Sequence, residues 1–308
     1  MGEPGDGAVV VTGEALIDLV LARDGSIEGH PGGGPYNVAR TVGRLEQTVA
    51  YVGCISTDGF GRRLRRELEA DGVDLHGVVS TDSPTTLALA ELDDAGAAEY
   101  RFYERGTSAP GLTLAAAEAA LPRRVGAFYL GTLGLVFEPL ATTLETLAAR
   151  MGPETLVVLD PNCRPSVIAD GAAFLGRLGR LLARTDVLKA SAEDLAWIDP
   201  GTDPVPAARA LIGQSHAVAL ITLGAGGALV VSTQHVIEVP SPHVDVVDTI
   251  GAGDAFTGAF LAHWRAHGLG RADVGRLDAV ERAVVFACRV AALTCARAGA
   301  DPPRRSEL

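Results

Sequence analysis

Hydrophobic and polar positions follow two alternating patterns along most of the chain. Short apolar or β-branched runs are followed by longer stretches in which apolar residues recur every three or four positions. The short runs predict strands and the longer stretches predict amphipathic helices. We expect strands at 9–12, 48–53, 127–130, 156–160, 185–190, 217–223 and 228–231, and helices at 37–45, 59–71 and 139–150.

This alternation predicts the fold class. Strands that alternate with helices at this spacing form parallel βαβ units, so we expect an α/β fold with a doubly wound, mainly parallel sheet. Such sheets bind ligands outside the carboxyl ends of their strands. The 308 residues contain no Pro/Ser-rich linker, repeat or low-complexity segment, which predicts a single domain over 1–308.

Two segments depart from this rhythm. Leu16 to Ile27 and Thr85 to Tyr103 each predict two strands around a turn, at 22–25 and at 93–96. Asp-Gly and Ala-Gly turns between alternating runs are typical of hairpins. The two hairpins could pair into one small sheet that projects from the domain, with excursions at about 16–31 and 84–105. The alternative is that both are edge hairpins of the main sheet.

The most informative segment is Asp248-Thr249-Ile250-Gly251-Ala252-Gly253-Asp254. It follows an extended apolar-alternating run and precedes an apolar helix pattern, so its glycine turn lies at a helix N-terminus with unpaired N–H groups. Two glycines let this backbone approach an anion closely. Asp254 beside the turn could accept a proton from a hydroxyl that attacks a phosphate, or it could serve only as a helix cap.

Commoner nucleotide motifs do not explain this turn. A dinucleotide fingerprint that starts at Gly251 needs glycine at position 256, where Phe256 stands, and one that starts at Gly224 meets Leu229. A Walker A loop needs Gly-Lys-Ser/Thr, but the only lysine of the chain is Lys189, which follows a leucine. Phosphoryl transfer that uses a different cradle fits the residues better.

The segment resembles the C-terminal signature Asp-Thr-x-Gly-Ala-Gly-Asp of the ribokinase-type (PfkB) carbohydrate kinases. A second segment, Gly32-Gly33-Gly34-Pro35-Tyr36-Asn37-Val38-Ala39, resembles their N-terminal Gly-Gly-x-x-x-Asn-x-Ala motif. The order of the two motifs and their separation of more than 200 residues match the family as well. The resemblance extends from Val9 to about Pro302 and implies a ribokinase-like kinase with a small β lid over its sugar.

The resemblance assigns roles to several of these residues. It implies that Asp254 is the base, and that Asp18, Gly33 and Asn37 contact the sugar. A carboxylate accepts hydrogen bonds from two neighbouring hydroxyls, which suits a polyol. The backbone of the turn would form an anion hole for the transferred phosphoryl group; we call it the anion cradle, and it consists of Gly251, Ala252 and Gly253.

Arginines and an aromatic residue add further candidates for sugar binding. Arg164 follows a predicted buried strand, and Tyr103 and Arg105 lie in the predicted lid. The guanidinium of arginine is forked and always charged, so it suits a phosphate or carboxylate oxygen. The arrangement resembles fructokinases and 2-keto-3-deoxygluconate kinases. The alternative is that these arginines are ordinary surface residues.

The family also implies an ATP site with Mg²⁺. Ser191 and Asp194 occupy the place of the family's Asn-x-x-Glu motif, where serine replaces asparagine and Asp194 stands at the glutamate position near Mg²⁺. The segment that follows the strand at 217–223 matches the nucleotide loop and supplies Thr222, Gly224 and Gly227. Many members bind a monovalent cation such as K⁺ near Asp248, but Pro303 replaces a serine ligand found in ribokinase itself.

Composition limits the other partners. The net charge of −12 argues against nucleic acid or an anionic membrane as the main partner. No apolar run is long enough to cross a bilayer, and the acidic N-terminus lacks the basic start of a signal peptide, so we expect a cytoplasmic protein. The family resemblance implies that the lid also forms a homodimer contact.

The identity of the sugar rests on one part of the resemblance. Gly-Gly-x-Pro-x-Asn with Pro35 is more similar to fructokinases than to ribokinase, which carries lysine where Gly34 stands. Fructose is therefore the expected acceptor, and 2-keto-3-deoxygluconate or another small sugar is the alternative. A protein of a different class, a sugar- and nucleotide-binding sensor without catalysis, would not need the base Asp254.

Overall fold

The computed structural model describes residues 7–22, 24–92, 98–213 and 217–308, and its centre is a nine-stranded sheet. The strands, in chain order, are β1 (Ala8–Thr12), β4 (Val49–Ser56), β5 (Val78–Thr81), β8 (Val125–Gly131), β9 (Leu156–Asp160), β10 (Val187–Ser191), β11 (Val218–Thr222), β12 (Ala228–Val231) and β13 (Val236–Val239). Their order in the sheet is β13-β12-β11-β10-β9-β8-β1-β4-β5. All neighbours from β5 to β11 pair in parallel, and β12 and β13 add an antiparallel edge.

This sheet confirms the predicted α/β class with a mainly parallel sheet. Each of the seven expected strand segments corresponds to one strand of the sheet. The sequence pattern did not indicate β5 and β13, which lie at the two edges and have four residues each. The run Val244–Val247, which the pattern predicted to be extended, forms no strand, and Val246 and Val247 are exposed.

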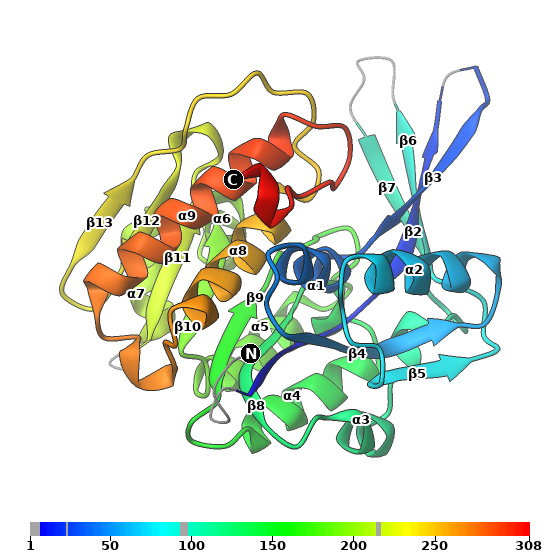
Figure 1. The fold of residues 1–308 in the computed structure, drawn as a ribbon, viewed down its shortest axis with the longest axis horizontal. Helices are drawn as coiled ribbons and strands as arrows, with labels where there is room; N and C mark the ends of the chain where they lie inside the picture. Colours follow the sequence, from blue (N-terminus) through cyan, green and yellow to red (C-terminus); the bar gives the residue numbers. More distant parts are fainter. Residues whose placement is uncertain (1–6, 23, 93–97, 214–216) are drawn as a thin grey trace.

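Helices cover both faces of the main sheet (Figure 1). One face carries α1 (Gly34–Arg44), α2 (Gly59–Ala70), α8 (Ala252–Ala266) and α9 (Leu277–Cys295). The other carries α3 (Leu114–Ala120), α4 (Leu140–Arg150), α5 (Gly171–Leu182), α6 (Ala192–Ile198) and α7 (Pro204–Ile212). Successive residues of a strand point to opposite faces, so Val9 and Val11 join the first core and Val10 joins the second. Burial of both faces explains the nearly continuous apolar runs.

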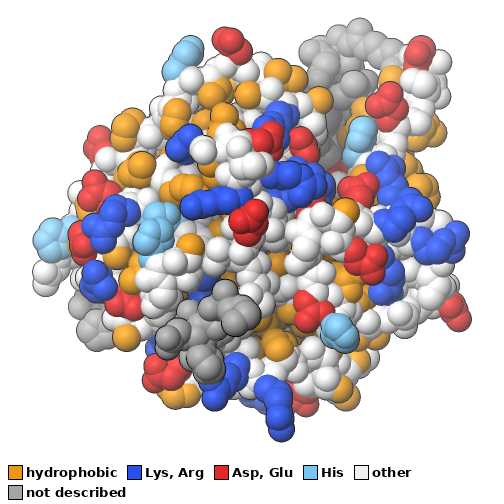
Figure 2. All heavy atoms as spheres, viewed as in Figure 1, with side chains coloured by type: hydrophobic (Ala, Val, Ile, Leu, Met, Phe, Trp, Pro, Cys, Tyr) orange, Lys and Arg blue, Asp and Glu red, His pale blue; other side chains and the backbone are white. Residues whose placement is uncertain are grey.

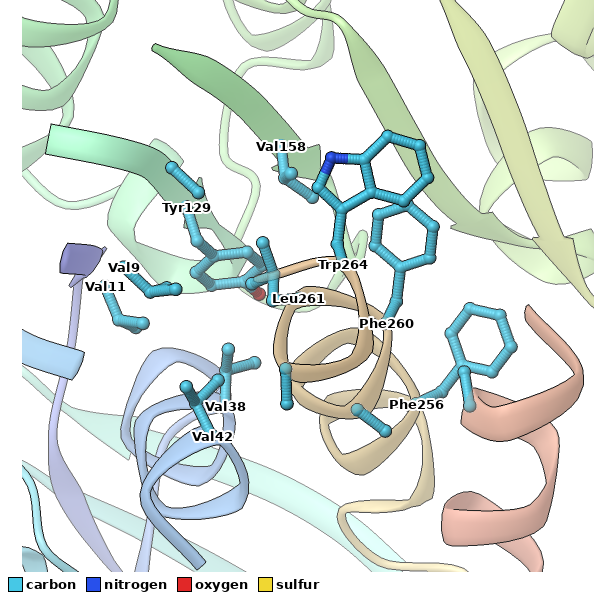
Figure 3. Packing of buried hydrophobic residues seen from close by; sticks show 14 of the residues in the cluster. Val9, Val11, Val38, Val42, Tyr129, Val158, Phe256, Phe260, Leu261 and Trp264 are labelled. Atoms are coloured by element: carbon cyan, nitrogen blue, oxygen red, sulfur yellow. The ribbon is translucent and has the colours of Figure 1, made fainter. Parts of the chain in front are cut away.

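Helix α8, next to the predicted site, is largely buried. Phe256, Phe260 and Trp264 project from it into the core, and Val38 and Val42 of α1 lie on its other side (Figure 3). The rings of Phe260 and Trp264 stack with centroids 5.4 Å apart. Because close-packed cores resist displacement, this packing fixes the N-terminus of α8, which carries the anion cradle and Asp254.

A second sheet of four strands projects beside the main sheet, at the upper right of Figure 1. It consists of β2 (Leu16–Leu21), β3 (Ile27–Gly32), β6 (Leu87–Leu92) and β7 (Ala98–Tyr103). The hairpins β2–β3 and β6–β7 are antiparallel and join through the parallel pair β2–β6. The two predicted hairpins thus form one small sheet. The first hairpin extends to Gly32 rather than ending at Ile27, and the predicted turn at 93–96 lies outside the described residues.

Short 3₁₀ helices connect several elements: η1 (Ala109–Gly111), η2 (Thr132–Leu135), η3 (Gly224–Gly226), η4 (Arg271–Asp273) and η5 (Arg305–Glu307). η2 supports the small sheet, because Leu133 packs in a minor core with Leu16 of β2 and Ala88 of β6. Within the described part of the chain, no helix combines the length and apolar character that a membrane span requires.

Candidate active site

Nearly all residues that the motifs indicate lie around one cavity of about 1370 Å³. The cavity lies where β8, β9, β10 and β11 end, as expected for a doubly wound sheet. Its volume exceeds the roughly 300–1,000 Å³ of a site for one small ligand, so it has room for two. The predicted site residues that line it are Asp18, Gly33, Asn37, Arg164, Ser191, Asp194, Thr222, Gly224, Gly227, Asp248, Gly251, Ala252, Gly253 and Asp254.

Asp254 lies in the first turn of α8, where its carboxylate faces the cavity. Its Oδ2 accepts a hydrogen bond of 2.9 Å from Nδ2 of Asn37. Burial raises the pKa of Asp254 to about 7, although the hydrogen bond from Asn37 and the charge of Lys189 act in the opposite direction. A carboxylate with this pKa can accept a proton near neutral pH, which suits a general base.

The anion cradle precedes Asp254. Gly251 caps α8 with φ of 74°, a left-handed conformation that favours glycine. A Cβ at Gly251 would lie 2.5 Å from Cβ of Ala300, so the cradle and the loop around Ala300 are in close contact. Nη1 of Arg40 donates to the carbonyl of Ala300 at 3.4 Å, which fastens that loop to α1. The first N–H groups of α8 therefore have a fixed position at the cavity.

Asp18 faces the cavity from the small sheet. It lies in β2 opposite His30 of β3, and its carboxylate occupies the space that a side chain at Gly32 would fill. Burial raises the pKa of Asp18 to about 6, and the charges of His30 and Arg164 oppose that shift. Asp18 and Asn37 thus present a carboxylate and an amide to the same cavity.

Asn37 is positioned by the glycine turn at the start of α1. Gly33 has φ of 107°, and a Cβ there would lie 2.7 Å from the carbonyl oxygen of Glu14. The turn therefore requires glycine at this position. Asn37 is buried, and its Oδ1 has no hydrogen-bond partner among the described residues. An unpaired buried acceptor that lines a cavity is suited to a ligand hydroxyl.

Glu14, which the sequence pattern did not single out, holds this turn in place. Its carboxylate accepts hydrogen bonds from the hydroxyl of Thr132, from N of Gly134 at 2.9 Å and from N of Gly34 at 3.2 Å. Burial raises the pKa of Glu14 to about 7. The signal in the sequence was a carboxylate within the apolar run that follows the first strand.

Lys189 is a second residue whose place the sequence pattern did not reveal. Its side chain is buried, and Nζ forms an ion pair of 2.9 Å with Oδ2 of Asp160. A Cβ at Gly253 would lie 3.1 Å from Nζ, so the ammonium is next to the anion cradle. The signal in the sequence was the one lysine of the chain, placed inside an apolar strand.

The three candidates for sugar binding outside the two glycine motifs and Asp18, namely Arg164, Tyr103 and Arg105, lie in different places. Arg164 lines the cavity and lies near Asp18 and Asp254. Tyr103 and Arg105 are not among the described residues that line it, and the side chain of Arg105 is 97 % exposed. The structure therefore brings Arg164 to the site but leaves Tyr103 and Arg105 on the surface.

On the side of the cavity where the sequence predicts the nucleotide, Ser191 and Asp194 form a capping box at the start of α6. Both carboxylate oxygens of Asp194 accept hydrogen bonds: Oδ2 from N and Oγ of Ser191 at 2.8 Å, and Oδ1 from N of Cys163 at 2.6 Å. Asp194 thus fastens two loops at the cavity wall. Glu193 beside it is exposed and lines the cavity, so its carboxylate is the more accessible of the two.

Two further loops line the predicted nucleotide side of the cavity. Thr222 ends β11, and Gly224 with φ of 56° and Gly227 with φ of 91° allow the tight turn to β12. The other loop contains Asp248, which links it to the loop around Gly299. Oδ1 of Asp248 accepts a hydrogen bond from N of Ile250 at 3.0 Å, and Oδ2 accepts one from N of Gly299 at 2.9 Å. Among the described residues, no group of three or more His, Cys, Asp or Glu side chains is arranged to hold a metal ion.

Comparison with known proteins extends this picture. The model of the pfkB family carbohydrate kinases matches residues 6–306. A fructokinase of Rhizobium leguminosarum bv. trifolii is 33 % identical over 304 residues, which cover 97 % of this chain and 88 % of that protein. The structure of a Xylella fastidiosa fructokinase with bound ATP has a TM-score of 0.86 at 27 % identity and covers 95 % of this chain and 93 % of that one. A Vibrio cholerae O395 fructokinase with fructose, ADP and calcium ion has a TM-score of 0.83 at 26 % identity, with coverage of 96 % and 94 %.

Proposed function

Because the chain belongs to the pfkB family of carbohydrate kinases, we propose that it transfers the γ-phosphoryl group of ATP to a primary hydroxyl of fructose. The observation that carries the proposal is the shared cavity, which Asp254, the anion cradle, Asp18 and Asn37 all line and in which Asn37 contacts Asp254. Relatives that are named fructokinases, one with bound ATP and one with fructose and ADP, support both ligands.

Each group of residues at the cavity would have its own role in the reaction. Asp18 and Asn37 would orient the sugar so that one hydroxyl approaches Asp254, which removes its proton as the oxygen attacks the γ-phosphorus. The bond from that phosphorus to the β–γ bridging oxygen breaks, and ADP leaves with this oxygen. The N–H groups of the anion cradle would stabilise the charge on the equatorial oxygens. The proton ends on Asp254, and the products are the sugar phosphate and ADP.

We also propose that Mg²⁺ accompanies ATP, since magnesium in such sites takes most of its ligands from phosphates and water. Glu193 is the accessible carboxylate at this wall, whereas Asp194 is engaged in the capping box. Bound there, the ion would neutralise phosphate charge. A K⁺ ion near Asp248 remains a proposal, and the link from Asp248 to Gly299 supports it by bringing the two loops together.

The cavity charge favours a neutral sugar over a sugar acid. Seven carboxyl side chains line it, and only Arg164 and Lys189 do so among the lysines and arginines of the described residues; the seven are Glu14, Asp18, Glu28, Glu193, Asp194, Asp248 and Asp254. Lys189 is already paired with Asp160. The carboxylate of 2-keto-3-deoxygluconate would therefore meet one guanidinium that forms no ion pair among the described residues, that of Arg164, and several acidic neighbours.

A sugar panel with a readout of ADP formation tests this function. We expect fructose to exceed 2-keto-3-deoxygluconate in kcat/KM by roughly tenfold or more, which corresponds to about 1.4 kcal/mol of differential binding in the transition state. A panel in which the sugar acid is the better substrate would reject fructose and keep the kinase. Binding of ATP and fructose without ADP formation would favour a non-catalytic sensor.

The pH dependence of kcat/KM provides a second test. Since the base acts only when it is deprotonated and burial raises the pKa of Asp254 to about 7, activity should fall as the pH drops through 7. The acid limb should approach a slope of one on logarithmic axes. The measurement uses saturating MgATP and limiting fructose at constant ionic strength, and enzyme returned to pH 8 controls for inactivation. A profile that stays flat well below pH 6 would contradict a base with this pKa.

We further propose that the chain acts as one catalytic domain in which the small sheet is the lid over the sugar, since Asp18 reaches the cavity from β2. The homodimer also stays a proposal. It is supported by apolar side chains on the small sheet that are 60 % exposed at Ile27 and 50 % exposed at Tyr103. Sedimentation velocity decides between a monomer and a dimer.

A further inference from the structure

Lys189 and Asp160 form a buried ion pair for which the proposed reaction has no direct use. The two side chains are 5 % and 0 % exposed, and the ion pair joins β10 to β9. A buried pair of this kind contributes little to stability, because the desolvation of two charges offsets their attraction. Oδ1 of Asp160 is also buried and has no hydrogen-bond partner within the described part of the chain. Stability alone therefore does not explain the pair.

The pair lies next to the anion cradle. Lys189 lines the cavity beside Gly253, and a side chain at this glycine would meet Nζ at 3.1 Å. Asp254 follows Gly253, and its carboxylate is within electrostatic reach of both charges of the pair. The ammonium and the carboxylate of the pair act on Asp254 in opposite directions.

The other groups that face Asp254 either stay uncharged near neutral pH or lie at the surface. From α1 comes the neutral amide of Asn37, and from β8 the buried hydroxyl of Tyr129, whose pKa is raised far above neutrality. Arg164, in the loop after β9, is exposed to solvent. Glu14 lies on the other side of Gly34, whose N donates a hydrogen bond to its carboxylate. The charges of Lys189 and Asp160 thus act on Asp254 from within the protein interior.

We propose that the buried Lys189–Asp160 pair is a positioning element for the base: its ammonium holds Asp254 as a carboxylate, and Asp160 limits that effect. This inference rests on the proposed function, in which Asp254 is the base. It assigns to Lys189 a role that acts through Asp254 rather than through contact with a substrate.

The inference predicts shifts of opposite sign for the two single variants. In Lys189→Met, the carboxylate of Asp160 loses its partner, and Asp254 should titrate at higher pH. In Asp160→Asn, the ammonium remains alone, and Asp254 should titrate at lower pH. A unit charge within roughly 6–10 Å at an effective dielectric constant of about 20 gives a shift of about one to two pH units.

The measurement is a ¹³C NMR titration of the free protein labelled at the aspartate carboxyl carbon. The signal of Asp254 is identified in each background as the one that disappears in Asp254→Asn. No substrate is needed, so the result does not depend on kinase turnover. Absence of ADP formation by the wild-type protein would reject the proposed function, whereas signals of Asp254 that do not move would reject this inference.

The double variant Lys189→Met/Asp160→Asn is the matched reference, since it removes both charges and leaves no unpaired buried ion. Its midpoint should lie between those of the single variants. If one single variant does not fold, as judged by near-UV circular dichroism, the other compared with the double variant still tests the sign. Midpoints that move in the same direction, or that coincide with the double variant, would overturn the proposal.

The acid limb of kcat/KM provides a second readout on the same chains. It should move to higher pH in Lys189→Met and to lower pH in Asp160→Asn, parallel to the NMR midpoints. A purely structural role would lower the plateau of both variants and leave the limb in place. That result, together with unchanged NMR midpoints, would leave the pair without a role in catalysis.

Discussion

Asp254→Asn should lower turnover by about 10²–10⁴-fold, the usual contribution of a general base. The amide that replaces the carboxylate has the same shape and can still accept the hydrogen bond from Nδ2 of Asn37. It cannot accept a proton from the sugar hydroxyl. ATP should bind at least as tightly as to the wild type, because one negative charge beside the phosphates is gone. Steady-state turnover and calorimetric ATP binding measure the two effects.

Asp278→Asn is the matched control for this substitution. Asp278 also lies in the first turn of a helix, α9, but its side chain is 63 % exposed and forms a surface ion pair with Arg282. Exposed pairs of this kind contribute about 0.3–0.5 kcal/mol, so the control should turn over like the wild type. If Asp254→Asn stayed within tenfold of this control, Asp254 would not be the base.

The main sheet could be predicted because its strands are buried on both faces. Residues such as Val10 and Val11 contribute to different cores, and this double burial requires the continuous apolar runs that the pattern detects. The edges lack this signal. β13 pairs with one neighbour and has an exposed residue at each alternate position, and β3 contains Pro31 and two glycines. Their pairing depends on partners elsewhere in the chain, which no local pattern records.

The site residues likewise fall into those that a local motif indicates and those that only the fold brings together. The anion cradle and the turn before Asn37 are local glycine motifs, so their residues could be named from the sequence. Glu14 could not, since it accepts hydrogen bonds from residues 118 and 120 positions away. Lys189 has its partner 29 positions away on a neighbouring strand. Arg105 carries the same chemistry as Arg164, and only the fold decides which of the two reaches the cavity.

Gly251→Ala should lower kcat by about 10²–10³-fold, as the loss of one oxyanion donor does. Alanine in the left-handed conformation costs roughly 1–2 kcal/mol, and its Cβ would lie 2.5 Å from Cβ of Ala300. The contact forces the cradle or the facing loop to shift, which misaligns the N–H groups with the transferred phosphoryl group. The KM for fructose should change less, because Asp18 and Asn37 belong to other elements.

Gly268→Ala separates the backbone strain from the contact with Ala300. Gly268 has φ of 66°, and a Cβ there would meet nothing within 4 Å. It lies just beyond the opposite end of α8, so the variant pays the same conformational cost away from the cavity. Both variants should melt a few degrees lower, but only Gly251→Ala should lose turnover. Equal turnover in the two variants would mean that the anion cradle does not stabilise the transition state, and phosphoryl charge would then have to be stabilised by groups other than the backbone of residues 251–253.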